Sequence, residues 1–268
     1  MSTFSTSRRF QSLLISAAVL LTTSTYASTT DAAAVLIDAE RSVRSQGTVA
    51  SNTSVESWSR QEFPATEFGA FSYVVDQSRA AGTNTASGTA SINSNITDTL
   101  FSGSGTSTSS AAVNESTTSY SSTSADANAT SRVTFQILSP TFFNLTALLA
   151  YDRVLGSGCC GGGATLSLRN TNYSSPGFNL SFGNSSANGD FSQNIQLSGV
   201  LDPNTYTLEA FSNSNARGYS VGSSELATGQ FDFSLSLSNV SAVPLPGTVW
   251  MLITGVMALA SRRAFRTA

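Results

Sequence analysis

The residues with the most distinctive chemistry in this sequence are two adjacent thiols, Cys159 and Cys160, inside the glycine-rich run 156–163. The chain has no other cysteine, so within one molecule the two thiols either stay reduced or close a strained ring between neighbours. The surrounding glycines allow the unusual backbone that such a ring needs. Three interpretations follow: a hairpin tip without a special role, a vicinal disulfide between Cys159 and Cys160, or a disulfide between two chains.

Catalytic groups are scarce, because the chain contains no histidine. Histidine is the commonest general base and the commonest transition-metal ligand, so no Ser-His-Asp or Cys-His arrangement is available. Paired carboxylates remain as an option, and Glu56, Glu62 and Glu67 lie near Trp58 in the sequence. Nothing in their spacing sets two of them at the separation that a glycosidase needs. We therefore expect no catalytic residue, no cofactor and no enzymatic activity.

Two further sets of side chains are candidates for binding. Trp58 is the only tryptophan before the C-terminal segment, and it is the candidate sugar contact, although isolated aromatic residues near strand ends more often belong to the core or its rim. The aspartates Asp152, Asp190, Asp202 and Asp232 carry oxygen atoms of the kind that bind Ca²⁺. No loop gathers several of them, so we interpret them as solvated turn residues and expect no metal site.

The charge of the chain argues against polyanionic partners. All 13 basic residues are arginines, and 16 residues are acidic. Five of the arginines lie near the chain ends, at positions 8, 9, 262, 263 and 266. The part between them therefore carries eight positive and 16 negative charges, a net charge of −8. Such a surface repels nucleic acid, so we expect no nucleic-acid partner. Nine Asn-x-Ser/Thr sequons and the hydroxyl-rich residues 83–130 make a glycoprotein a further hypothesis.

The first 27 residues have the features of a secretory signal peptide. Arg8 and Arg9 form a basic start, residues 13–21 form an apolar core, and Thr25-Tyr26-Ala27 is a small-x-small cleavage site. We predict export through the secretory translocon and cleavage after Ala27.

The last residues, 242–268, combine a proline pair, a short apolar segment and a basic end in that order. The prolines hold their predecessors in extended conformations, and the arginines hold the end on the cytoplasmic side of a membrane. A spanning helix needs about 20 apolar residues, so the transmembrane helix expected over residues 247–261 is a marginal span. The pattern is carried by Val243, Pro244, Leu245, Pro246, Val249, Trp250, Gly255, Arg262 and Arg263.

These residues closely resemble the PEP-CTERM sorting signal of Gram-negative bacteria in its Val-Pro-Leu-Pro variant. The family pattern is a Pro-x-Pro box, an apolar helix that often starts with Val-Trp and contains Gly, and an Arg-rich tail. The commoner box has Glu at the position of Leu245, and the resemblance covers roughly a tenth of the chain. It implies recognition by an exosortase, a membrane cysteine protease and transpeptidase. The alternative interpretation is an ordinary C-terminal membrane anchor.

Residues 28–241 have the pattern of an all-β domain. Apolar and polar residues alternate in 133–137, 143–151 and 231–237, as in half-buried antiparallel strands separated by turns. The Ser/Thr-rich part, residues 80–130, fits either polar strands or a glycosylated linker, and we favour strands because threonine suits pleated sheets. Residues 32–44 fit a helix or a strand equally well. The sequence therefore predicts an antiparallel, jelly-roll-like β-sandwich between a signal peptide and a short transmembrane helix.

Taken together, these features predict an exported protein that is held for a time in the inner membrane and then reaches the cell surface or the extracellular matrix. The resemblance implies that it accompanies exopolysaccharide and biofilm formation, and we expect a structural or adhesive role. The alternative is a secreted, lectin-like carbohydrate-binding module that uses Trp58.

Overall fold

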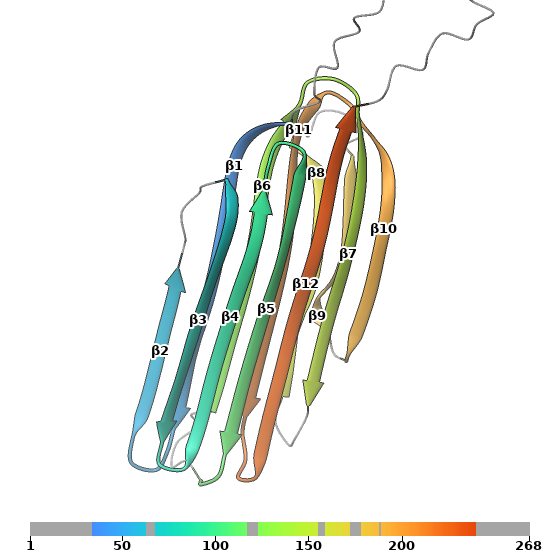
Figure 1. The fold of residues 1–268 in the computed structure, drawn as a ribbon. Helices are drawn as coiled ribbons and strands as arrows, with labels where there is room; N and C mark the ends of the chain where they lie inside the picture. Colours follow the sequence, from blue (N-terminus) through green and yellow to red (C-terminus); the bar gives the residue numbers. More distant parts are fainter. Residues whose placement is uncertain are drawn as a thin grey trace, which may run out of the picture.

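The structure, a computed structural model, describes residues 34–62, 68–116, 123–154, 159–171, 178–187 and 189–239. Within these ranges the chain forms 12 strands and no helix. The strands form two six-stranded antiparallel sheets that lie face to face (Figure 1). The predicted all-β class and the β-sandwich are therefore confirmed. The predicted signal peptide with Ala27, and the C-terminal segment 242–268, lie outside the described residues.

The two sheets are called sheet A and sheet B. In spatial order, sheet A contains β2 (Val55–Glu62), β1 (Val35–Ala50), β6 (Thr123–Ile137), β11 (Asn204–Gly218), β8 (Cys159–Asn170) and β9 (Asn179–Ala187). Sheet B contains β10 (Phe191–Leu201), β7 (Thr141–Val154), β12 (Ser223–Asn239), β5 (Leu100–Val113), β4 (Asn84–Ile96) and β3 (Gly69–Ala81).

Most connections cross from one sheet to the other. Neighbours in sequence share a sheet only at β1–β2, along β3–β4–β5 and at β8–β9. The first and last described strands meet at one end of the sandwich, because the Ala34 amide donates to the Asp98 carbonyl and the Leu237 amide donates to the Thr99 carbonyl. In Figure 1 this is the upper end, where β1 starts and β12 finishes. β12 itself lies inside sheet B, between β7 and β5.

The strands follow the alternation of the sequence, including its most polar part. Residues 84–96 and 100–113 form β4 and β5, with alternate residues buried and partly exposed, so the preference for strands over a linker in residues 80–130 is confirmed for these segments. Residues 32–44 were left open between helix and strand, and their described part from Val35 onward belongs to β1. The choice is made by tertiary pairing, since β1 has hydrogen-bonded neighbours on both sides.

The core changes in side-chain size from one end of the sandwich to the other. Near the shared end it contains large residues such as Phe101 and Phe135, whose ring centroids lie 4.7 Å apart across the two sheets. Toward the other end the buried residues of both sheets are mainly alanine, serine and glycine. There the sheets approach closely: a Cβ on Gly229 would lie 2.6 Å from the Asn213 carbonyl oxygen and 2.7 Å from that of Gly163, both in sheet A. Small side chains thus permit a thin core at this end.

Candidate functional site on the outer face of sheet B

The outer faces of the two sheets differ in charge. Sheet A carries a line of ion pairs: Arg132 contacts Glu40 at 3.0 Å and Glu209 at 3.1 Å, and Glu209 also contacts Arg169 at 3.3 Å. On the strands of sheet B, the outward positions carry serine, threonine, asparagine and glutamine with a few apolar residues. Their only charges are three aspartates, at positions 76, 152 and 232. The outward strand positions of sheet B therefore carry no cation in the described part of the chain, and the exposed Arg79 lies at the edge, on β3, beside Ser87 and Ser110.

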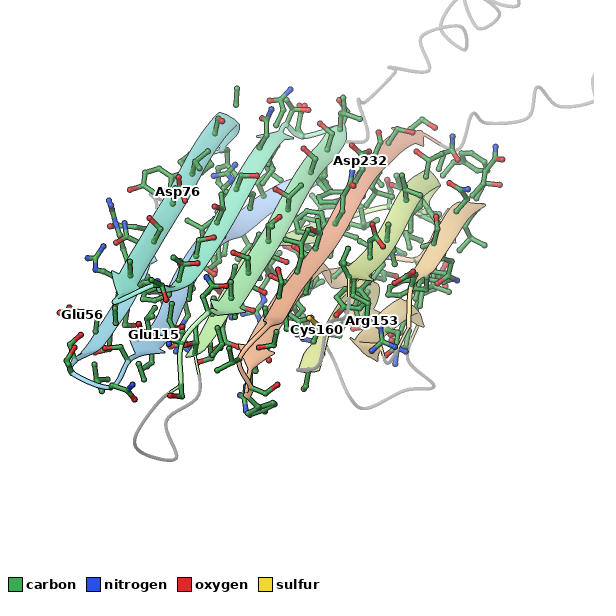
Figure 2. The ribbon with its side chains drawn as sticks, turned by 90° about the horizontal axis from the view of Figure 1, so that it is seen from below. Glu56, Asp76, Glu115, Arg153, Cys160 and Asp232 are labelled. Atoms are coloured by element: carbon green, nitrogen blue, oxygen red, sulfur yellow. The ribbon has the colours of Figure 1, made fainter. Side chains whose placement is uncertain are left out.

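The strand register places one row of outward side chains across all six strands of sheet B, and we call it the Asp232 row. Each member lies opposite the next in an antiparallel pair, so neighbours are separated by about 4.8 Å, the strand spacing. From β3 to β10 the row contains Ser72, Asn93, Ser104, Asp232, Leu148 and Asn194. Figure 2 shows Asp232 on β12 and, well away from it on β3, Asp76.

Hydroxyl groups toward the β3 side of this face bond mainly to one another. The Ser91 and Thr106 hydroxyl oxygens lie 2.6 Å apart, and the Thr89 hydroxyl donates to the Asp76 carboxylate at 2.8 Å. Cross-strand bonds of this kind stabilise the pairing of neighbouring strands. Several polar groups on this side of the face therefore already have partners, and a separate hollow of about 340 Å³ lies farther along β3 and β4, lined by Arg79, Thr85 and Ser87 among others.

Around Asp232 the surface is hollowed on both sides. A hollow of about 620 Å³ is lined by Thr146, Leu148, Asn194 and Gln196 together with Asp232. A second one, of about 240 Å³, is lined by polar residues of β4 and β5 and again by Asp232. Asp232 is exposed and lines both hollows.

Several polar side chains in these hollows have hydrogen-bond donors and acceptors that no other group of the described residues uses. Within the described residues, the side chains of Asp232, Asn93, Asn194 and Gln196 make no hydrogen bond or ion pair with the protein. A carboxylate offers acceptors only, whereas each amide offers both donors and an acceptor. The arrangement suits a ligand that has many hydroxyl groups, since a hydroxyl both donates and accepts.

Asp232 was not identified as a site residue from the sequence, where it was interpreted as a turn residue. That interpretation is wrong, because Asp232 lies in the middle of β12, and Asp152 likewise lies within β7. The signal was present in the flanking residues: Phe231 and Phe233 alternate with Asp232, and both are buried. Strand alternation then points Asp232 to solvent on the opposite face.

The side chains of the two cysteines point to opposite faces of the strand that contains them. They begin β8, where Cys159 lies opposite Arg217 and Cys160 opposite Ala216, so the hairpin-tip interpretation is wrong. Successive residues of a strand point to opposite faces: Cys159 is exposed, Cys160 is buried, and both are free thiols. No vicinal ring is present in this structure. A disulfide between chains through Cys159 stays a prediction.

Cys160 instead takes part in a small buried cluster beneath sheet B. Its thiol lies 3.7 Å from a carboxylate oxygen of Glu225 and 3.6 Å from the Leu226 carbonyl oxygen. Burial, and secondly the charge of Glu225, raise the pKa of Cys160 to about 12. Burial also raises the pKa of the neighbouring Tyr151 to about 12. Both groups therefore stay protonated and unreactive near neutral pH.

Trp58, the candidate sugar contact, is a core residue. Only 8% of its surface is exposed, and its indole N–H donates to the Ser45 hydroxyl at 3.1 Å. The ring lies directly over Gly47, where a Cβ would come within 2.2 Å of it. An indole in this position has no free face on which a sugar ring could stack, so the structure does not support the sugar contact expected at Trp58.

The other predicted features divide into those that the structure places and those that it does not reach. Glu62 forms an ion pair with Arg60 at 3.0 Å, and Glu67 lies outside the described residues. Among the described residues, no three His, Cys, Asp or Glu side chains are grouped so as to hold a metal ion. The described part of the chain also contains no helix of the length and hydrophobicity that a membrane span requires. The residues of the sorting pattern, from Val243 to Arg263, lie outside it.

No protein-family model matches the chain, and no curated protein matches its sequence significantly.

Proposed function

We propose that this chain is an exported, exosortase-processed protein of the cell surface or extracellular matrix, with a structural or adhesive role linked to exopolysaccharide or biofilm. The proposal rests on one observation above all. The Pro-x-Pro box begins at Val243, four residues after β12 ends at Asn239, and the Trp, Gly and paired Arg of the pattern follow in order. A sorting signal is thus attached directly to the end of the sandwich.

The finer parts of the sequence prediction belong to this proposal as well. They are a signal peptide over residues 1–27, a jelly-roll-like arrangement of the sandwich, and a transmembrane helix over residues 247–261 that holds the chain in the inner membrane until exosortase cuts it. The low charge of the domain and the polar side chains on its outer faces fit a module that is displayed at a surface. We assign it no catalytic role.

The alternative, a lectin-like module that uses Trp58, is not favoured in that form, because the indole is buried. Any carbohydrate recognition has to use other residues, and the outer face of sheet B is where the structure offers them.

Intact mass spectrometry of the protein from its host, with and without exosortase activity, tests the proposal. The mature protein is expected to lack the C-terminal segment in the active host and to retain it, in the inner membrane, when the enzyme is absent. Replacement of Pro246 by Ala should block processing, whereas Pro203→Ala, in the turn between β10 and β11, should not. A mature protein that still ends at Ala268 in the inner membrane of the active host would refute the proposal.

A further inference from the structure

We propose that the outer face of sheet B binds an uncharged polysaccharide along the Asp232 row. The inference deepens the proposed adhesive role by naming its ligand class and rests on that role. It differs from the lectin-like alternative in both residue and face, since Trp58 lies under sheet A and Asp232 lies on the outside of sheet B.

Charge decides which class of polymer fits. The outward positions of sheet B carry three aspartates and no arginine in the described part of the chain, and the chain contains no lysine. A polyanion such as a uronic-acid polymer or a nucleic acid would meet like charges at all three of these aspartates. On sheet A, by contrast, outward positions carry arginines, among them Arg132, which is paired with Glu40 and Glu209, and the exposed Arg217. The face of sheet B is therefore matched to a neutral ligand.

Hydrogen-bonding chemistry then favours a sugar. The free carboxylate of Asp232 is able to accept from two hydroxyl groups, and bonds of this charge-assisted kind are stronger than those between neutral groups. Asn93 and Asn194, on either side of it in the row, add amide donors and acceptors. Leu148 lies next to Asp232 on β7 and supplies an apolar surface for the C–H groups of a sugar ring.

The extent of the row favours a polymer over a single sugar. Six strands give five spacings of about 4.8 Å, so the row is about 24 Å long. The two hollows, of about 620 and 240 Å³, meet at Asp232. A monosaccharide would use only one of them, whereas a chain lying across the strands would use both and pass over Asp232.

Binding of the purified full-length protein, kept in mild detergent, to immobilised polysaccharides tests the inference. The panel contains dextran, cellulose, mannan and agarose as uncharged polymers and alginate as the polyanion. We expect binding to at least one uncharged polymer and none to alginate. Asp232→Ala should weaken that binding by about tenfold or more, as expected for loss of a hydrogen bond to a charged group. Gln196→Ala, on a different strand of the same hollow, should weaken it severalfold.

The matched control is Asp76→Ala, which removes another exposed carboxylate of the same face. Asp76 is bonded to Thr89 and lies outside both hollows, so binding should be unchanged. Thermal unfolding of each variant checks that the sandwich is intact. Failure of every uncharged polymer to bind, preference for alginate, or equal loss of binding in Asp76→Ala and Asp232→Ala would overturn the inference. Exosortase processing is measured separately by intact mass, so failure of the binding inference and failure of the proposed function give different results.

Discussion

The close approach of the two sheets at Gly229 gives a sharp prediction for stability. Replacing Gly229 by Ala would place a methyl group 2.6 Å from the Asn213 carbonyl oxygen and 2.7 Å from that of Gly163. Both atoms belong to backbone in the middle of sheet A, so neither moves aside without disturbing paired strands. Overpacking a well-packed core costs about 1–3 kcal/mol. Because two backbone contacts are involved, we expect a loss near the upper end, about 3 kcal/mol.

The matched control is Gly161→Ala in β8. Nothing lies within 4 Å of the position that its Cβ would take, and alanine restricts the unfolded chain more than glycine does. We therefore expect Gly161→Ala to leave stability unchanged or to raise it by about 0.4–1 kcal/mol. Urea unfolding followed by circular dichroism measures both variants, and an unchanged m-value shows that the same surface is exposed. If Gly229→Ala proves as stable as Gly161→Ala, the thin core at this end of the sandwich is incorrect.

Two further predictions concern the buried thiol. First, a maleimide added at pH 8 after reduction should label Cys159 and spare Cys160 in the folded protein, because only Cys159 is exposed. In denaturant both cysteines should be labelled. Peptide mass spectrometry measures the labelling, and equal labelling of both cysteines in the folded protein would contradict the prediction. Stability should fall as pH rises from about 9 toward 12, since the unfolded thiol loses its proton near 9.0 while folded Cys160 keeps it to about 12. Tyr151, whose pKa is also raised, lowers the stability at high pH in the same direction. In the Cys160→Ala variant, the free energy of unfolding, measured in urea at several pH values, should fall less steeply with pH. An unchanged dependence on pH would contradict a thiol that the fold keeps protonated.

The class of fold could be predicted because local alternation survives in each strand. Val133–Ile137 and Phe231–Leu237 show it with large apolar residues, and these lie at the end of the sandwich with the large core side chains. In β4 and β5 the inward residues are mostly small, so the signal was weak, and strand propensity alone favoured the correct answer. The order of the strands was not predictable, since most connections cross between the sheets and sequence alternation carries no information on pairing partners.

The site was predicted less well, for physical reasons that differ between residues. Trp58 was a candidate because of its residue type, but Gly47 opposite it on β1 leaves room for the indole to lie flat and buried. Arg41 is also fully buried, and its Nε–H donates to the Ser94 hydroxyl at 2.7 Å, a contact between residues 53 positions apart. The Asp232 row brings together six strands, and only the register of five ladders makes it visible.

The position of β12 has a mechanical consequence for a surface protein. This strand runs directly toward the C-terminal segment, and it is hydrogen-bonded to β5 on one side and to β7 on the other over nearly its whole length. A pull applied at Asn239 acts along the strand, so it loads two ladders in shear at once, with their bonds perpendicular to the force. Many bonds must then break together before the strand slides. A load that enters through the face of sheet B and leaves the domain at Asn239 therefore passes through two ladders that are both loaded in shear.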